Sequence, residues 1–291
     1  MPIIRDMARE LAANVAMSVA PVRNWRINRP RAGARFSPGL LERYAFQAFR
    51  GLERHGVQVE GRSVAEFGPG DTLAAGLALL AAGAETYTCL DRFVPDYSRP
   101  AAREWYREVR AAWHQSFPGR SWPAWLEPDR FPVAYPHRAR VLDVAVERAQ
   151  QDERYDVVCS WQVGEHVEDI RAFATLTAAM LKSNGVAVHR VDFGPHGCWE
   201  RYEDPLTFLR FPRWAWRAMG SARGVPNRHR HHEFMQAWEA ARLAVECREL
   251  TRFAPESIRF DRLHPTFRGM PRESLLTRDV IYVCRPHVAL R

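Results

Sequence analysis

Long apolar runs are missing from this sequence of 291 residues. No run of about 18 apolar residues occurs, so the sequence predicts no transmembrane helix. The best N-terminal candidate, residues 11–20, is interrupted by Asn14 and Ser18 and follows two acidic residues, which argues against a secretion signal. We therefore expect a cytoplasmic protein without membrane insertion.

Paired cysteine motifs are also missing. The five cysteines are widely spaced and form no C-x-x-C pair, which argues against a disulfide framework or a cysteine zinc site. Four of them lie in strand-like runs, where we expect small buried hydrophobes: Cys89, Cys159, Cys247 and Cys284.

Lysine is almost absent, since Lys182 is the single lysine among 42 basic residues. Such a skew is typical of codon bias, which a binding surface would not require. The 34 acidic residues are interleaved with the arginines, so the formal net charge of +8 predicts a solvated surface rather than a nucleic-acid partner.

Strands and helices alternate from residue 39 onwards, which is typical of a parallel α/β sheet. A helix over residues 39–56 comes first. Five strands and two intervening helices follow: strands 63–67, 86–90, 140–142, 156–160 and 185–193, and helices 72–82 and 169–181. Two more strands, 245–250 and 280–284, are separated by a segment with three prolines. That segment disfavours a crossover helix and predicts an antiparallel pair at the sheet edge.

Two long connections and an N-terminal segment stand outside this pattern. We expect residues 1–40 to form an arm or lid and residues 41–291 the main domain, with insertions at about 93–139 and 194–232. Aromatic residues are frequent in both insertions. They fit an apolar substrate chamber under a lid and packing onto the body equally well. The arm is equally suited to covering the site and to forming a homodimer.

The first strand ends in a glycine-rich turn made of Glu66, Phe67, Gly68, Pro69 and Gly70. Such a turn lets the backbone approach a ligand and directs free N–H groups at it. Leu73 stands where a dinucleotide fingerprint has a third small residue, which argues against a pyrophosphate. The carboxylate of Glu66 suits the ammonium group of an amino-acid moiety.

Acidic residues follow the next two strands. Asp91, beside Arg92, is placed to accept hydrogen bonds from both hydroxyls of a ribose. Asp143, beside Val144, is placed to meet an adenine edge. With Ser160 at the end of the fourth strand, these residues complete the predicted ligand site.

The stretches EFGPGD, LDRF, LDV, YDVVCSWQVGEHVEDI and LKSNGVAVHRVDF resemble the class I S-adenosylmethionine-dependent methyltransferases over roughly residues 50–195. The resemblance implies a Rossmann-like, seven-stranded, mostly parallel sheet with helices on both faces. It also implies S-adenosylmethionine as the cofactor of the site above. Gly164 replaces a common leucine of that family, which we expect to loosen or open the site.

Methyl transfer from a sulfonium is an in-line displacement, so the protein has to align the acceptor and exclude water. A general base helps where the acceptor is a hydroxyl or an amine. Candidates near the ends of strands four and five are Glu165, His166, His189, Asp192 and His196. We expect His166 to be the base, assisted by Glu165 and His196.

A metal is not expected. Some methyltransferases that modify RNA ends carry a metal-binding E-x-x-E-H motif, but Gln162 occupies the first glutamate position here. A second group of histidines, at 229, 231 and 232, is interspersed with arginines and predicts a solvated helix start. Asn227 and Arg228 are candidates for polar contacts to the acceptor.

The sequence therefore predicts methyl transfer to an oxygen or nitrogen of a small or medium-sized acceptor, such as a natural product, a sugar or a lipid-like molecule. Three alternatives remain open: an RNA-modifying methyltransferase, supported only by the net charge; a catalytically inactive relative that binds the cofactor; and a nucleotide-dependent oxidoreductase.

Overall fold

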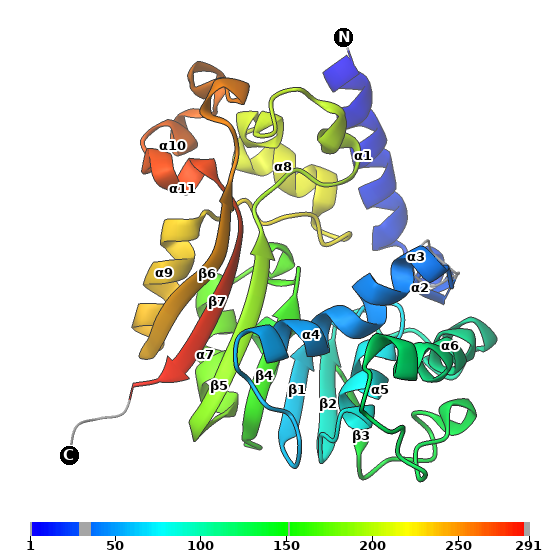
Figure 1. Ribbon diagram of the computed structural model, residues 1–291. Coiled ribbons are helices and arrows are strands. Elements are labelled where there is room, and N and C mark those ends of the chain that lie inside the picture. The colour runs from blue at the N-terminus through cyan, green and yellow to red at the C-terminus, as the bar shows by residue number, and fades with distance from the viewer. Residues whose placement is uncertain (1, 29–35, 151, 288–291) are drawn as a thin grey trace.

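The computed structural model describes residues 2–28, 36–150 and 152–287, and its centre is a seven-stranded sheet (Figure 1). The strands are β1 (Ser63–Phe67), β2 (Thr86–Asp91), β3 (Ala139–Asp143), β4 (Tyr155–Trp161), β5 (Leu181–Asp192), β6 (Leu243–Arg252) and β7 (Thr277–Pro286). Their order is β3-β2-β1-β4-β5-β7-β6, and the strands from β1 to β5 are all parallel. β7 runs antiparallel to both β5 and β6, which confirms the predicted pair at the edge.

Helices cover both faces of the sheet, as predicted (Figure 1). On one face lie α4 (Gln47–Arg54), α5 (Ala74–Ala81) and α6 (Pro100–Ser116); on the other lie α7 (Ile170–Met180) and α9 (His231–Ala240). α5 consists of small and apolar residues that are all buried. Each fully buried leucine of such a helix contributes about 1.5–3 kcal/mol to folding.

A long helical segment precedes β1. It comprises α3 (Pro38–Leu41), a π-helical turn (Glu42–Phe46) and α4. Gly51 of α4 lies against the ring of Trp161 at the end of β4, where a Cβ atom would be 2.1 Å from the ring. Glycine at this position therefore allows the helix to approach the end of the sheet at which the parallel strands finish.

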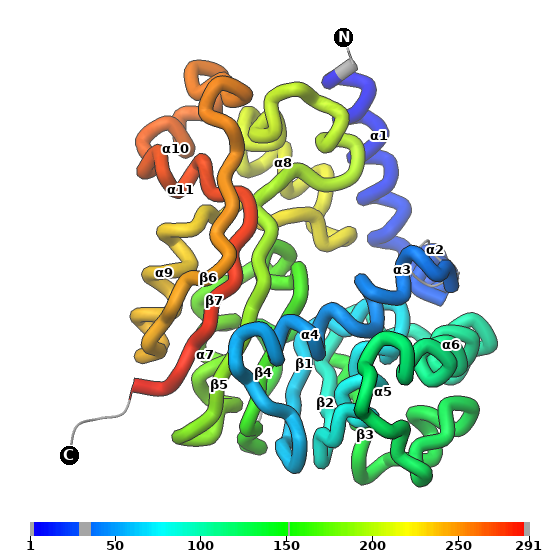
Figure 2. Tube along the Cα trace, in the orientation of Figure 1, coloured from blue at the N-terminus to red at the C-terminus, as the bar shows by residue number. Residues whose placement is uncertain are grey.

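A cap covers that end of the sheet. It is formed by residues 194–230 and 253–276, which lie together above the strands in the trace (Figure 2). The cap holds short helices: 3-10 turns Gly197–Arg201, Thr207–Arg210, Pro255–Ser257 and Phe260–Arg262, with α8 (Arg213–Gly220), α10 (Pro265–Arg268) and α11 (Arg272–Leu276). The absence of a long crossover helix between β6 and β7 was predicted from the prolines and is confirmed.

The N-terminal arm packs on the cap. It comprises α1 (Pro2–Ser18) and α2 (Ala20–Asn28); residues 29–35 of the predicted arm lie outside the described part of the chain. Asp6 of α1 accepts a 2.5 Å hydrogen bond from Tyr202, and Glu10 pairs with Arg223. Asn14 donates to the Ala218 carbonyl, which lies in α8. One side of α1 is therefore tied to the segment 202–223.

Several aromatic residues of the insertion 93–139 are part of the core. Trp105, Tyr106 and Trp113 of α6 are fully buried and pack with the helices that cover β1 and β2. Trp122 is partly buried against the same cluster. Of the two interpretations of this insertion, packing onto the body is the one that the structure supports.

The cysteine prediction holds for three residues and is wrong for one. Cys89, Cys159 and Cys284 are buried in strands, whereas Cys247 is exposed because β6 is the edge strand. Of the helices that the structure describes, none combines the length and the apolar character needed to cross a membrane.

Candidate functional site

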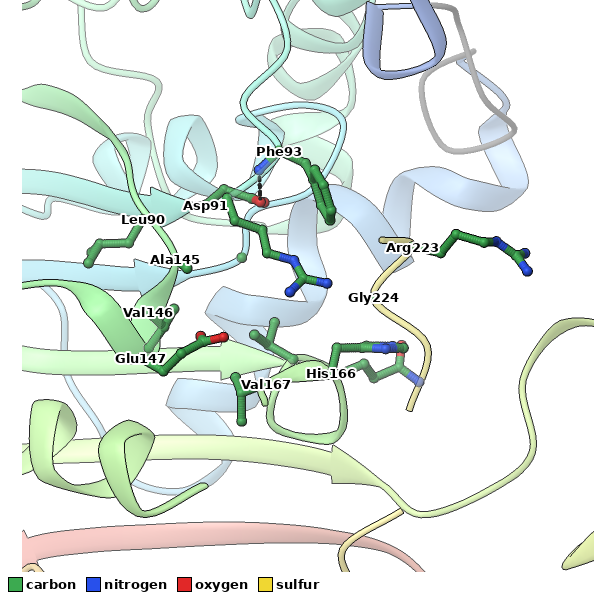
Figure 3. Close-up of a pocket in the computed structure, with 14 residues that line it drawn as sticks. Leu90, Asp91, Phe93, Ala145, Val146, Glu147, His166, Val167, Arg223 and Gly224 are labelled. Carbon is green, nitrogen blue, oxygen red and sulfur yellow. Dashed lines mark hydrogen bonds between the residues drawn. The ribbon is translucent and has the colours of Figure 1, made fainter. Parts of the chain in front are cut away.

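A cavity of about 220 Å³ lies where the parallel strands end (Figure 3). The turns that follow β1, β2, β3 and β4 form its walls, and the segment after α8 closes one side. Its lining residues are Gly68, Leu90, Asp91, Arg92, Phe93, Ala145, Val146, Glu147, Gln162, Val163, His166, Val167, Arg223 and Gly224. This is the crevice at the carboxyl ends of the strands in which open α/β sheets bind their ligands.

The glycine turn forms one wall and is held in place by the neighbouring segment. Gly68 and Gly70 have φ values of +65° and +79°, in the left-handed region that favours glycine. A Cβ atom on Gly68 would be 2.6 Å from the Val163 side chain. Tyr97 donates a 2.9 Å hydrogen bond to the Gly70 carbonyl. The turn therefore presents bare backbone to the cavity, as the sequence predicts for a cofactor-binding turn.

Asp91 lies at the end of β2 and faces the cavity (Figure 3). Its carboxylate accepts a 2.8 Å hydrogen bond from the Phe93 N–H and a longer one, 3.4 Å, from the Gly70 N–H. Burial raises its pKa above the usual value. Arg92 beside it lies over the Phe93 ring and against Gly224, where a Cβ atom would meet its guanidinium. The predicted Asp91 and Arg92 are therefore both part of the cavity.

Three predicted cofactor residues are buried behind the wall instead. Glu66 is buried and accepts a 2.5 Å hydrogen bond from Tyr87, and burial raises its pKa to about 7. Phe67 packs in the core, and the Ser160 hydroxyl is bonded to His189. None of the three lines the cavity, and their direct contact with a cofactor stays a prediction. Their side chains point into the layers between sheet and helices rather than out of the strand end.

Three other predicted residues flank the cavity without lining it. Asp143 is exposed at the end of β3, and the N–H of Val144 donates to the Asp91 carbonyl. Pro69 lies in the glycine turn but outside the lining. The lining instead continues with Ala145, Val146 and Glu147, a few residues further along the chain, so the adenine-edge prediction for Asp143 is not supported.

A tight turn after β4 carries two of the three predicted catalytic residues, Glu165 and His166. It is the 3-10 turn Gly164–His166, and Asn227 fixes it by donating from its side chain to the carbonyls of Gly164 and Val167. A Cβ atom on Gly164 would be 2.9 Å from Val191. The expectation that Gly164 loosens the site is therefore wrong, because glycine here permits close packing. Asn227 supports the turn rather than an acceptor.

Glu165, His166 and His196 come together at this turn, as predicted. Their ligand-capable atoms all lie within 4.8 Å of one another, a spacing that could hold a metal ion. The rings of His166 and His196 are 5.0 Å apart between centroids. A nitrogen of His196 lies 3.6 Å from a carboxylate oxygen of Asp192.

The pKa values of the groups in this cluster are shifted from their usual values. Glu165 is 2% exposed, and neither of its carboxylate oxygens has a hydrogen-bond partner. Burial raises its pKa well above the usual value, and the charge of Asp192 adds to that effect. Burial and, to a smaller extent, the charge of His196 lower the pKa of His166 to about 4, and its Nδ1 also lacks a partner. Hydrogen bonds from His196 and Gly194 outweigh the effect of burial and lower the pKa of Asp192.

The remaining histidines of the prediction lie elsewhere. His189 is buried between Ser160 and Thr177 and stacks on Trp238, and burial lowers its pKa to about 3. It is a core residue beneath the site, so its candidacy as a base is wrong. His229, His231 and His232 bond Glu233, Tyr282 and Ser274 respectively. They mark the start of α9 but are half-buried rather than solvated.

Arg228 is a structural residue too. It is buried in the cap, donates 2.6 Å to the Phe211 carbonyl and lies over the rings of Trp216 and Phe267. It therefore holds the cap together and is not available to an acceptor.

A larger cleft of about 930 Å³ adjoins the turn from the other side. Segments of α3, α4, β4, β5, β6 and β7 line it with five arginines and four acidic residues: Arg43, Arg50, Arg54, Arg190, Arg278, Glu42, Asp192, Glu249 and Asp279. Trp161 and Gln162 also line this cleft, and Gln162 lines the cavity as well. Gln162 therefore borders both spaces, and it precedes the turn that carries Glu165 and His166 by two residues.

Sequence reasoning named four of the fourteen lining residues, Gly68, Asp91, Arg92 and His166, as site residues and missed the other ten. Glu147, Arg223 and Gly224 lie in irregular segments, and no spacing or motif in the sequence connects 223 and 224 with residue 91. Gln162 could have been found, since it follows the fourth strand closely in the sequence. In the structure its φ is +60°, an uncommon value for a residue other than glycine, and the chain turns there.

Comparison with known proteins identifies the family. A family model for a methyltransferase domain matches residues 41–248. A search of curated proteins found no significant match. Among solved structures, the chain is similar to an S-adenosylmethionine-dependent methyltransferase from Mesorhizobium loti (15% identity, 81% of this chain and 96% of that chain covered, TM-score 0.43). It is also similar to geranyl diphosphate C-methyltransferase from Streptomyces coelicolor (10% identity, 82% and 78% covered, TM-score 0.48).

The family match spans more than half of the chain and removes the oxidoreductase alternative. The site fits S-adenosylmethionine, because bare backbone at Gly68 and the carboxylate of Asp91 both face the cavity. The chain belongs to the methyltransferase-domain family of class I S-adenosylmethionine-dependent methyltransferases, and S-adenosylmethionine is its cofactor.

Proposed function

We propose that this methyltransferase transfers a methyl group to an oxygen or nitrogen of a small or medium-sized polar acceptor of the sugar-like type. The observation that carries the proposal is that Gln162 borders two spaces: a cofactor cavity on one side and a charged cleft on the other. S-adenosylmethionine, when bound, supplies an electrophilic methyl group on its sulfonium sulfur. An acceptor in the cleft would approach it from the side of His166.

The charge of the cleft favours a hydroxylated acceptor over a lipid. Three of its arginines are paired with carboxylates, at 2.9 Å for Arg50 and Glu42, 3.2 Å for Arg54 and Glu249, and 3.0 Å for Arg190 and Asp279. An apolar acceptor would take these ion pairs out of water without replacing the hydrogen bonds that water makes to them, which costs free energy. Hydroxyl groups can accept from the arginines and donate to the carboxylates.

The reaction centre of the proposal is formed by Glu165, His166 and His196. His166 lines the cofactor cavity and lies beside His196, which pairs with Asp192 of the cleft wall. These side chains would hold the reacting oxygen or nitrogen and assist the loss of its proton. The cap above them would exclude water during transfer.

The test is an acceptor screen in which S-adenosylhomocysteine and the methylated product are measured by mass spectrometry. The panel pairs sugars, glycosides and sugar acids with phenols and fatty acids. We expect turnover with members of the sugar group, and an Arg278→Ala variant should raise their KM while S-adenosylmethionine affinity stays unchanged. The matched control is Arg110→Ala, which removes an exposed arginine of α6 that pairs with Glu127. Turnover confined to fatty acids would contradict the proposal.

A further inference from the structure

The cluster of Glu165, His166 and His196 contains three buried polar atoms for which the described chain supplies no well-formed hydrogen bond. Both carboxylate oxygens of Glu165 are buried without a well-formed hydrogen bond, although the backbone N–H groups of Glu165 and Asp192 lie near them. Nδ1 of His166 is likewise buried without a partner. Native proteins rarely leave buried polar atoms in this state, and each such atom calls for a partner or a functional reason.

We infer that Glu165, His166 and His196 bind a divalent first-row transition-metal ion at the junction of the cofactor cavity and the acceptor cleft. One atom from each side chain lies within 4.8 Å of the other two, so small side-chain adjustments bring all three to one ion. The inference deepens the proposed function and rests on it for the role of the ion, but binding itself does not depend on catalysis.

The donor set indicates which ions fit. Two imidazoles and one carboxylate suit Zn²⁺, Mn²⁺, Fe²⁺ and similar ions, whereas Mg²⁺ and Ca²⁺ prefer oxygen ligands throughout. Three protein ligands leave at least one position open, which is the arrangement of catalytic rather than structural metal sites. Gln162, at the position that argued against a metal in the sequence, is not needed, because His196 supplies the third ligand from the segment after β5.

The surroundings of the cluster support a cation. Asp192 lies 3.6 Å from His196 and accepts a 2.7 Å hydrogen bond from the Gly194 N–H, so it is held in position to orient that imidazole. Carboxylates commonly support metal-bound histidines in this way. On the other side of the cluster, Asn227 fixes the turn that carries Glu165 and His166. Two carboxylates near one another in a buried place favour a positive charge between them.

The position of the cluster indicates a role for the ion in methyl transfer. In the transfer, the acceptor oxygen forms a bond to the methyl carbon while the carbon–sulfur bond breaks and its electron pair stays on sulfur. The acceptor's proton passes to water in the adjoining cleft. A cation beside the acceptor oxygen lowers the pKa of its hydroxyl and favours that loss.

Metal binding is tested on tag-free, chelator-treated protein by calorimetric titration with ZnCl₂ and MnCl₂, and by metal analysis after gel filtration. We expect one ion per chain, and Mg²⁺ should not compete. Glu165→Gln and His196→Ala should each lower metal affinity at least about tenfold, and Asp192→Asn should lower it by about tenfold. The control His114→Ala removes an exposed histidine of α6 and should leave the affinity unchanged.

A parallel titration with S-adenosylmethionine separates this inference from the proposed function and shows that each variant is folded. Protein that binds S-adenosylmethionine but takes up no stoichiometric metal would overturn the metal site and leave the methyltransferase proposal intact. Metal affinity that is unchanged in both Glu165→Gln and His196→Ala would also overturn it, and would indicate that Glu165 is buried as a neutral acid.

Discussion

The insertion at 93–139 buries its tryptophans on one face of the sheet, whereas the insertion at 194–232 lies over the strand ends and contributes to the cofactor cavity. Both are long and rich in aromatic residues. Only Phe93, at the start of the first insertion, reaches the cavity, while the second supplies Arg223 and Gly224. Aromatic content therefore does not distinguish a lid from an extension of the core. What differs is the strand that each segment follows, β2 or β5, and the helix α1, which packs against α8 of the second insertion.

The largest expected effect is on the first insertion. Trp113→Ala should lower the free energy of unfolding by about 3–5 kcal/mol, because a fully buried ring packed against Phe46, Phe49 and Phe117 is lost. Chemical denaturation measures it, with Trp125→Ala, at 41% exposure in the same insertion, as the milder control. If the insertion served chiefly as a lid, folded Trp113→Phe would lose cofactor affinity with little change in stability.

The free energy of unfolding should depend on pH through His189, which lies in the sheet beneath both insertions. Its folded pKa of about 3 lies below the unfolded value of 6.5, so the unfolded state binds the proton first as pH falls. The contribution of His189 to the free energy of unfolding is fully present above pH 6.5. It is lost as pH falls towards 3, by about 1.4 kcal/mol per pH unit. Unfolding free energies of His189→Gln between pH 6.5 and 4.5 should show a shallower slope than the wild type. Equal slopes would refute the buried neutral histidine.

Where the two insertions meet at the cavity, Asp91→Ala should weaken S-adenosylmethionine binding by about 1–3 kcal/mol, the scale of lost hydrogen bonds to a charged group. Calorimetry measures the affinity. Asp143→Ala is the matched control: it removes an acid from the neighbouring strand end that lies outside the lining and should change affinity little. The reverse ranking would restore the sequence-based assignment of Asp143 to the cofactor.

The smallest effect concerns the arm. Glu10 pairs with Arg223, which lines the cavity, so Glu10→Gln should weaken S-adenosylmethionine binding by less than about 1 kcal/mol. Arg5→Gln, on the same helix and exposed, provides the comparison. An effect of equal size for both variants would mean that the arm does not act through Arg223.

The sheet could be predicted because its signals are local. Strands such as 63–67 and 156–160 are short apolar runs between turn residues, and they fold close to those bounds. Three prolines between residues 252 and 277 correctly indicated an antiparallel pair rather than a crossover helix. The start of β5 was harder to predict: the strand begins at Leu181, four residues before the predicted start at Gly185.

The site could be predicted only in part. Gly68 and Asp91 follow strand ends, and their spacing identifies them. Glu66 also lies near a strand end, but its side chain is buried and bonded to Tyr87. Alternate residues of a strand point to opposite faces of a sheet, and the sequence does not show that Glu66 and Tyr87 share a face. Glu147 and Gly224 depend on how irregular segments fold over the sheet, which no local pattern records.

The most direct test of the account is a parallel calorimetric titration of the purified protein with S-adenosylmethionine, S-adenosylhomocysteine and NADH. The structure and the family predict that the first two bind at one site per chain, that Asp91→Ala weakens both, and that NADH does not bind. Binding of NADH alone, or of none of the three to folded protein, would contradict the assignment of the cavity to S-adenosylmethionine.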